Sequence, residues 1–251
     1  MKTYVNGIII RETALGESDK LVKILTAEKG VISAIAKRCR SLKNKKNSAV
    51  QLFSYCRFSL YSGKKGYIID ESEILELFWG IKEDLSRLSL AQYFCELCLV
   101  LLPEENYAGD FLRFFLNSLF YLSNQKKSAA FLKAVFEMRV CSICGYMPNL
   151  IGCHKCKAYE LPNMNFIIES GIIICENCIS SEEKIQQGYA LKPGLLAALR
   201  HIIYSSVEKL FSFSISKETE TALFDICEKY VTSHVGANFK SLNFYKSIAQ
   251  M

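Results

Sequence analysis

The sequence predicts an α+β protein of several domains: a small antiparallel β-barrel, a helical domain, and a cysteine-rich module inserted into the helical domain. Strand-type alternation separated by turn residues dominates the first eighty residues, and helical periodicity dominates from Trp79 onward. Six of the eleven cysteines lie between Cys141 and Cys178. The expected boundaries are 1–80 for the barrel, 81–148 and 185–251 for the helical domain, and 149–184 for the inserted module.

Composition limits the class of protein. Half of the residues are hydrophobic, which is enough for a sizeable core. No apolar run reaches the roughly eighteen residues of a membrane span, and no signal peptide is recognisable. An odd number of cysteines without a signal peptide favours a reducing compartment, so we expect a cytoplasmic protein.

The strand signals explain the barrel. Glu28-Lys29-Gly30 marks a turn between two of them, and Ser62-Gly63 begins another. Five short strands with one long basic loop are typical of a closed barrel, and the OB-fold is the commonest such barrel for oligonucleotides. The expected strands cover 3–12, 21–27, 31–37, 50–61 and 67–78.

The strand at 50–61 also offers a candidate surface. One of its faces carries Phe53, Tyr55 and Tyr61 together with Arg57. These aromatic side chains are either a stacking platform for nucleic-acid bases or a face that packs against the helical domain, and the sequence leaves both interpretations open.

Charge is distributed unevenly. Residues 1–80 contain fourteen Lys and Arg against eight Asp and Glu, which accounts for the whole net charge of +6. We call residues 37–46 the basic segment. It has no acid and suggests contact with a polyanion, most often nucleic acid. A solvated loop without a partner is the alternative, and a membrane surface is less favoured because no amphipathic helix accompanies the charges. The cations of the basic segment are Lys37, Arg38, Arg40, Lys43, Lys45 and Lys46, and Arg57 is added as a candidate contact.

Cysteine spacing predicts a metal site. Two C-x-x-C pairs separated by eighteen residues match the spacing of a four-thiolate zinc site, and the residues between them read as a hairpin around Gly171. We expect one structural Zn²⁺ per chain, because four thiolates leave no position for a water. The expected ligands are Cys153, Cys156, Cys175 and Cys178.

A third C-x-x-C pair, Cys141 and Cys144, continues the apolar stripe of a helix and is interpreted as core. His154 lies inside one knuckle and is a less favoured alternative ligand. Cys95 and Cys98 also lie on an apolar helix and are interpreted as core.

The helical domain follows from apolar periodicity. Helices are expected near 85–102, 110–122, 127–144, 195–211 and 217–234, with residues from Val235 onward as a tail. The sequence contains no G-x-x-x-x-G-K-[ST], no H-E-x-x-H and no nucleophile–histidine arrangement, so we do not expect an enzyme. The alternatives are a zinc-ribbon nucleic-acid-modifying enzyme and a DNA-binding regulator. Strand annealing without ATP or Mg²⁺ would distinguish a protein that only binds nucleic acid from a metal-dependent nuclease.

Several motifs, in this order and spacing, resemble the RecO family of bacterial DNA repair and recombination mediator proteins. The resemblance covers nearly the whole chain. Its motifs are Gly16-Glu17-Ser18-Asp19-Lys20, Thr26-Ala27-Glu28-Lys29-Gly30, Ala36-Lys37, Tyr93-Phe94-Cys95-Glu96-Leu97, Phe136-Glu137-Met138-Arg139, Gly145-Tyr146-Met147-Pro148-Asn149-Leu150, the two cysteine knuckles, His234-Val235-Gly236 and Lys240-Ser241-Leu242.

The resemblance implies an OB-fold, a helical domain and a zinc module. It also implies binding of single- and double-stranded DNA, annealing of complementary strands, and partnership with RecR, with the acidic tail of single-strand-binding protein and, indirectly, with RecA at the bacterial nucleoid. Two departures stand out. Arg38 occupies a position where the family often has glycine, and Cys141 and Cys144 occupy positions where leucines are usual.

Overall fold

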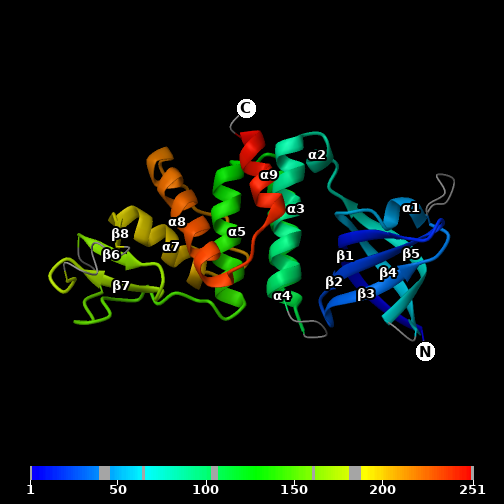
Figure 1. Ribbon diagram of the computed structural model, residues 1–251, viewed down its shortest axis with the longest axis horizontal. Coiled ribbons are helices and arrows are strands. Elements are labelled where there is room, and N and C mark those ends of the chain that lie inside the picture. Colours follow the sequence, from blue (N-terminus) through cyan, green and yellow to red (C-terminus); the bar gives the residue numbers. More distant parts are fainter. Residues whose placement is uncertain are drawn as a thin grey trace. The chain divides into compact units, whose positions relative to one another are not determined.

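The computed structural model describes residues 2–39, 46–63, 66–102, 107–159, 162–180 and 188–249, with the side chains of all of these except Lys46 and Ala249. The chain forms two compact units (Figure 1): unit 1 is Met1–Lys126 with Phe239–Met251, and unit 2 is Lys127–Asn238. The fold class is α+β, as predicted. Within the described ranges, every helix is too short or too polar to cross a membrane.

Unit 1 begins with a closed five-stranded barrel. Its strand order is β1-β2-β3-β5-β4, with β4 also paired to β1 and a short helix between β3 and β4, which is the OB-fold arrangement. One pair departs from the expectation: β3 and β5 run parallel, so the barrel is not wholly antiparallel. The elements are β1 (Lys2–Leu15), β2 (Asp19–Thr26), β3 (Gly30–Ala36), α1 (Lys46–Ala49), β4 (Ser54–Gly63) and β5 (Gly66–Leu77).

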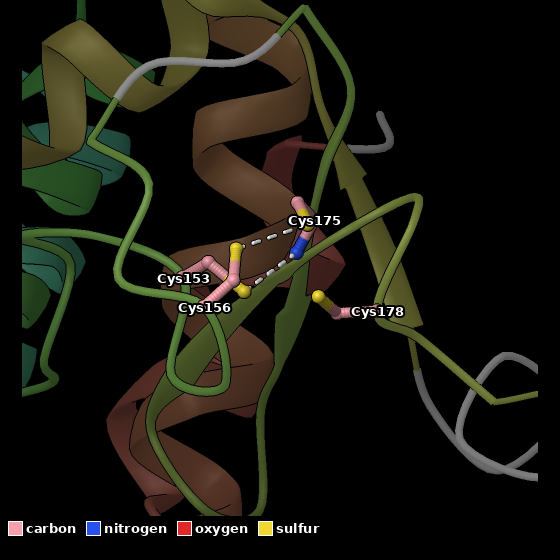
Figure 2. A group of neighbouring side chains, drawn as sticks. All are labelled: Cys153, Cys156, Cys175 and Cys178. Carbon is pink, nitrogen blue, oxygen red and sulfur yellow. Dashed lines mark hydrogen bonds between the residues drawn. The ribbon is translucent and has the colours of Figure 1, made fainter.

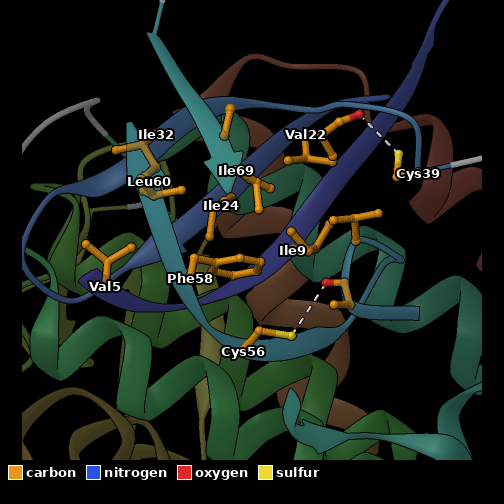
Figure 3. Close-up of a cluster of buried hydrophobic side chains, with 14 residues drawn as sticks. Val5, Ile9, Val22, Ile24, Ile32, Cys39, Cys56, Phe58, Leu60 and Ile69 are labelled. Atoms are coloured by element: carbon orange, nitrogen blue, oxygen red, sulfur yellow. Dashed lines mark hydrogen bonds between the residues drawn. The ribbon is translucent and has the colours of Figure 1, made fainter. Parts of the chain in front are cut away.

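The barrel core forms from side chains that alternate inward along the strands (Figure 3). Gly7 lets β1 approach β2 closely, because a Cβ there would lie 2.6 Å from the Ile24 side chain. The same core includes Cys39 and Ala49, which stand on either side of residues 40–45. The labelled members in Figure 3 are Val5, Ile9, Val22, Ile24, Ile32, Cys39, Cys56, Phe58, Leu60 and Ile69.

Four helices complete unit 1. The Asp84 side chain caps α3 by accepting a hydrogen bond of 2.7 Å from the Arg87 amide. The expected tail after Val235 is wrong in part, because its end forms a helix that packs on α3. These helices are α2 (Trp79–Lys82), α3 (Leu85–Leu101), α4 (Gly109–Ser123) and α9 (Lys240–Ala249).

Unit 2 consists of helices and a small sheet. Ser128 and Ser216 cap the first and last helices through their side chains. Helix α7 ends at Tyr204, seven residues before the expected end, where Arg139 donates to the carbonyls of Ile202 and Ile203. The helices are α5 (Ala129–Ile143), α7 (Pro193–Tyr204) and α8 (Lys217–Val235).

The sheet of unit 2 has the order β7-β6-β8. The predicted hairpin is confirmed, and Gly171 takes the expected positive φ, 64°. The third strand was not predicted, because it lies apart from the cysteine pairs in sequence. The strands are β6 (Met164–Ile167), β7 (Ile172–Cys175) and β8 (Gly188–Leu191).

Candidate metal centre and nucleic-acid interface

The four predicted ligand cysteines lie together in unit 2. Figure 2 shows Cys153 and Cys156 on one loop facing Cys175 and Cys178, which lie at the end of β7 and just after it. All four sulfur atoms lie within 4.8 Å of one another, and we call them the cysteine cluster. A set of four thiols this close, from two chain segments, can hold a metal ion.

Backbone hydrogen bonds shape the loops that carry these thiols. The Cys153 amide donates to the Ala158 carbonyl at 2.8 Å, and Lys157 between them adopts a positive φ of 65°. The His154 amide donates to the Ile173 carbonyl at 2.7 Å, which joins the first loop to β7. Each knuckle is therefore held by local turns and by the sheet.

The cysteine cluster favours ionised sulfur at one position. Burial would raise the pKa of Cys153, but hydrogen bonds from the backbone amides of Cys156, Cys175 and Lys155 lower this pKa to about 6. The pKa of Cys178 rises to about 12, first through its hydrogen bond with Cys175 and then with Cys156. These neighbouring thiols cannot all ionise together, because their negative charges would repel one another. A bound cation would stabilise all four as thiolates.

The third cysteine pair lies elsewhere. Cys141 is fully buried in α5, and Cys144 is half-buried at its C-terminal end. Burial raises the pKa of Cys141 to about 12 and that of Cys144 to about 11, so both remain neutral thiols. This is the behaviour expected of core cysteines.

Arg200 is a site residue that sequence reasoning missed. From α7 it donates to the carbonyls of Leu150, Ile151 and Tyr159 at 2.7 to 2.8 Å, and its guanidinium lies 4.3 Å from the centre of the Tyr159 ring. It holds both ends of the loop that carries Cys153. No spacing motif indicates this role, because the partners are 41 to 50 residues away.

The basic segment begins at the end of β3. Lys37 and Arg38 are exposed, and the Arg38 amide donates to the Asp19 carboxylate at 2.8 Å. This bond, followed by one from the Ser18 hydroxyl, lowers the pKa of Asp19. Arg40, Lys43 and Lys45 lie outside the described residues, as does the side chain of Lys46.

Two residues near the ends of the basic segment, Cys39 within it and Ala49 just after it, lie in the barrel core. Cys39 is fully buried and its thiol donates to the Ala36 carbonyl at 3.2 Å. Ala49 is also buried and its carbonyl accepts from the Cys56 thiol at 3.5 Å. Figure 3 shows both bonds. The described residues on either side of positions 40–45 are therefore part of the barrel core.

The aromatic face of the 50–61 strand does not form one platform. Phe53 is buried, with a positive φ of 67°, and its amide donates to the Ile9 carbonyl at 3.0 Å. Tyr55 is half-buried, whereas Tyr61 is 43% exposed. Arg57 is exposed and lies 3.1 Å from the Glu73 carboxylate. The structure thus separates residues that strand alternation had grouped.

A closed five-stranded barrel of the OB type, a set of helices and a four-cysteine module define a protein of the OB-fold class. Two family models match the chain: Recombination protein O N terminal over residues 1–78 and Recombination protein O C terminal over residues 82–243. The chain belongs to the RecO family of DNA repair proteins.

Relatives support this assignment over the full length. The chain is 32% identical to a DNA repair protein RecO of Acetivibrio thermocellus over 97% of this chain and 96% of that protein. It is 28% identical to one of Symbiobacterium thermophilum over 97% of this chain and 96% of the relative. The corresponding protein of Alkaliphilus metalliredigens is 25% identical over 99% and 100%.

Proposed function

We propose that this protein is a recombination mediator that binds single- and double-stranded DNA through unit 1 and anneals complementary strands. The observation that carries the proposal is the basic segment, anchored at Cys39 and Ala49 in the core of an OB barrel. Unit 1 also holds the entire net charge of the chain, because unit 2 contains eleven cations and eleven acids. A cationic surface that releases counterions favours the approach of a polyanion.

Annealing requires no bond chemistry, so binding geometry is the main requirement. Contacts to phosphates leave the bases available for pairing. The DNA contacts in this proposal are Lys37, Arg38, Arg40, Lys43, Lys45, Lys46 and Arg57. Remodelling of strands coated with single-strand-binding protein would use its acidic tail, and RecR would act with this protein to load RecA. The proposed place of action is the cytoplasm, at the nucleoid.

The proposed metal is one Zn²⁺ held by the cysteine cluster. The mutual approach of the four sulfur atoms and the lowered pKa of Cys153 support a thiolate set, and zinc is the usual ion for such a set. Four thiolates leave no open position, so a bound ion would cross-link the two loops and take no part in a reaction. This role is structural and leaves DNA contact to unit 1.

The salt dependence of DNA binding tests the proposal. If about five cations each neutralise one phosphate, log K against log salt on single strands should have a slope of roughly −3 to −4, at about −0.7 per contact. Replacing Lys43, Lys45 and Lys46 with Ala should flatten the slope by about 2 and weaken unrelated sequences alike. The matched control replaces Lys192, Lys209 and Lys217, three exposed cations of unit 2, with Ala. An unchanged slope in the first variant, or the same loss in the control, would contradict the proposal.

A further inference from the structure

Trp79 is an exposed aromatic side chain that the proposed contacts do not use. It is the only tryptophan of the chain, and 62% of it is exposed. It begins α2, directly after the barrel. An indole buries a large apolar area when it finds a partner, so its exposure in unit 1 calls for an explanation.

The backbone around Trp79 is held firmly. Ile81 is fully buried, and Gly80 lies so close to α4 that a Cβ there would be 2.2 Å from the Ser123 carbonyl oxygen. The Arg87 guanidinium donates to the same carbonyl. Helix α2 is thus fixed against α4, and Trp79 is presented from a rigid turn rather than from a loose loop.

A cation accompanies the indole. The Lys82 ammonium lies 5.5 Å from the centre of the Trp79 ring and donates to the Gln51 side-chain carbonyl at 3.0 Å. Gln51 follows α1, the helix on which the basic segment ends. Gln51 and Lys82 therefore connect the residues that follow α1 to Trp79.

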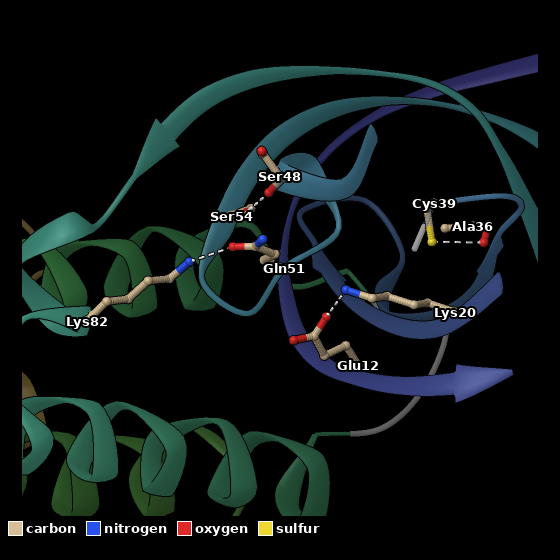
Figure 4. A network of polar contacts seen from close by, with 8 residues as sticks. All are labelled: Glu12, Lys20, Ala36, Cys39, Ser48, Gln51, Ser54 and Lys82. Atoms are coloured by element: carbon tan, nitrogen blue, oxygen red, sulfur yellow. Dashed lines mark hydrogen bonds and ion pairs between the residues drawn. The ribbon is translucent and has the colours of Figure 1, made fainter. Parts of the chain in front are cut away.

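Two further charged side chains interact with Lys82. The Lys20 ammonium lies 2.7 Å from the Glu12 carboxylate, and both groups act electrostatically on Lys82. Figure 4 shows Lys20 and Glu12 in one view with Lys82 and Gln51. Two acids follow Lys82 in the sequence: Glu83 is exposed, and Asp84 is engaged in capping α3. Because the Lys20–Glu12 pair is neutral as a whole, Lys82 supplies the positive charge beside the indole that would favour a phosphate.

We propose that Trp79 stacks on a base of single-stranded DNA whose phosphates pass beside Lys82. This inference rests on the proposed DNA-binding function. A single ring beside a cation is sufficient for a base, because every base has a flat π-face. A stable protein partner would instead need about 800 Å² of contact surface.

Tryptophan fluorescence gives a direct test with the full-length protein. Titration with oligothymidylate at low salt should quench the emission of Trp79, in parallel with binding measured by anisotropy of a labelled oligonucleotide. Trp79→Ala should weaken binding by about fivefold or more, and Trp79→Phe by less. The salt slope should stay unchanged in Trp79→Ala, because the indole carries no charge, whereas Lys82→Ala should flatten it by about 0.7.

A relocated indole provides the control. The double variant Trp79→Phe/Tyr204→Trp moves the single tryptophan to an exposed position in unit 2, where DNA should not quench it. Binding by anisotropy with no quench, or with unchanged affinity in Trp79→Ala, would overturn the stacking role and leave the proposed function standing. Absence of any DNA binding would overturn both, and a changed slope in Trp79→Ala would show that the substitution disturbs the basic segment instead of removing a stack.

Discussion

Arg38 combines a positive charge with a backbone conformation that glycine adopts more readily. Its φ is 51°, in the left-handed region where an L side chain crowds its own backbone. The adjacent Asp19 carboxylate accepts from the Arg38 amide and helps to hold this shape. Arg38 therefore supplies a positive charge while its backbone is held in a strained conformation.

Replacement of Arg38 with Gly should separate these two effects. We expect the free energy of unfolding to rise by about 1 kcal/mol, because the left-handed strain is relieved. The slope of log K against log salt for single-stranded DNA should flatten by about 0.7. Urea denaturation and DNA titrations measure the two quantities.

The matched control is Lys37→Gly. Lys37 has no positive φ, so this variant loses the same charge and should lose roughly 0.5–1 kcal/mol of stability. Equal stability changes in the two variants would show that the conformation of Arg38 carries no strain.

At the residue scale, local patterns predicted some roles and missed others. The knuckle spacing grouped Cys153 with its three partners, and helical periodicity separated Cys141 from them. Strand alternation grouped Phe53 with Tyr55 and Tyr61 on one face, but its positive φ turns the chain before β4 begins, and its ring is buried whereas Tyr61 is exposed. Arg200 had no local signal, because its role depends on three carbonyls distant in sequence.

At the scale of elements, a buried ion cluster joins α5 to α8. The Lys133 ammonium lies 2.8 Å from the Glu137 carboxylate of its own helix and 2.8 Å from the Glu228 carboxylate of α8. Lys133 and Glu137 are fully buried, and the Phe224 ring centre lies 4.0 Å from the ammonium. Charges this deep are tolerated only when each has its partner.

Lys133→Met should destabilise the protein by roughly 3–5 kcal/mol, because it leaves two carboxylates without their buried cation. The triple variant Lys133→Met/Glu137→Leu/Glu228→Leu removes every charge of the cluster and should recover most of that loss. Chemical denaturation of the three proteins decides the matter: a triple variant no more stable than Lys133→Met would show that the cluster does not act as a unit.

The metal module permits a second test at this scale. Cys175→Ser should lower zinc content and loosen residues 150–180, because metal binding and folding are coupled in such modules. Cys141→Ser should leave zinc near one per chain, because Cys141 is a buried thiol of α5. Elemental analysis with hydrogen exchange measures both effects; loss of metal from Cys141→Ser but not from Cys175→Ser would reverse the assignment.

Helices and strands could be predicted from the sequence where residues close together in the chain stabilise them. The hairpin of the metal module follows from its alternation and from Gly171. Helix α9 was missed because its contacts are remote: the Glu96 carboxylate accepts from the amides of Lys240 and Ser241 and from the Ser241 hydroxyl. No pattern among neighbouring residues in the sequence indicates such a cap, because Glu96 lies far from α9 along the chain.

At the scale of the whole molecule, motifs that are separate in sequence meet in space. The Phe239 ring lies 5.5 Å from that of Tyr93, next to the bonds of Glu96, so the segment after Asn238 belongs to unit 1. Sequence composition predicted where the charge lies, but it did not predict that the chain leaves unit 1 at Lys126 and returns to it 113 residues later. Unit 2 is consequently one continuous stretch, Lys127–Asn238.

Because unit 2 is one continuous stretch of chain, we expect a fragment of residues 127–238 to fold by itself. It contains α5, α7 and α8, the three-stranded sheet and all four cysteines of the cluster, so its core and its proposed zinc are both present. Its eleven cations and eleven acids balance, and four metal-bound thiolates would add negative charge, so it should show no DNA binding at low salt. Deletion of residues 239–251 from the full chain should instead destabilise unit 1, because Phe239, Leu242 and Tyr245 are buried there. Circular dichroism, zinc analysis and DNA titration of the fragment, with the full chain as control, test this division. A fragment that folds and binds DNA as tightly as the full chain would mean that the interface does not lie in unit 1.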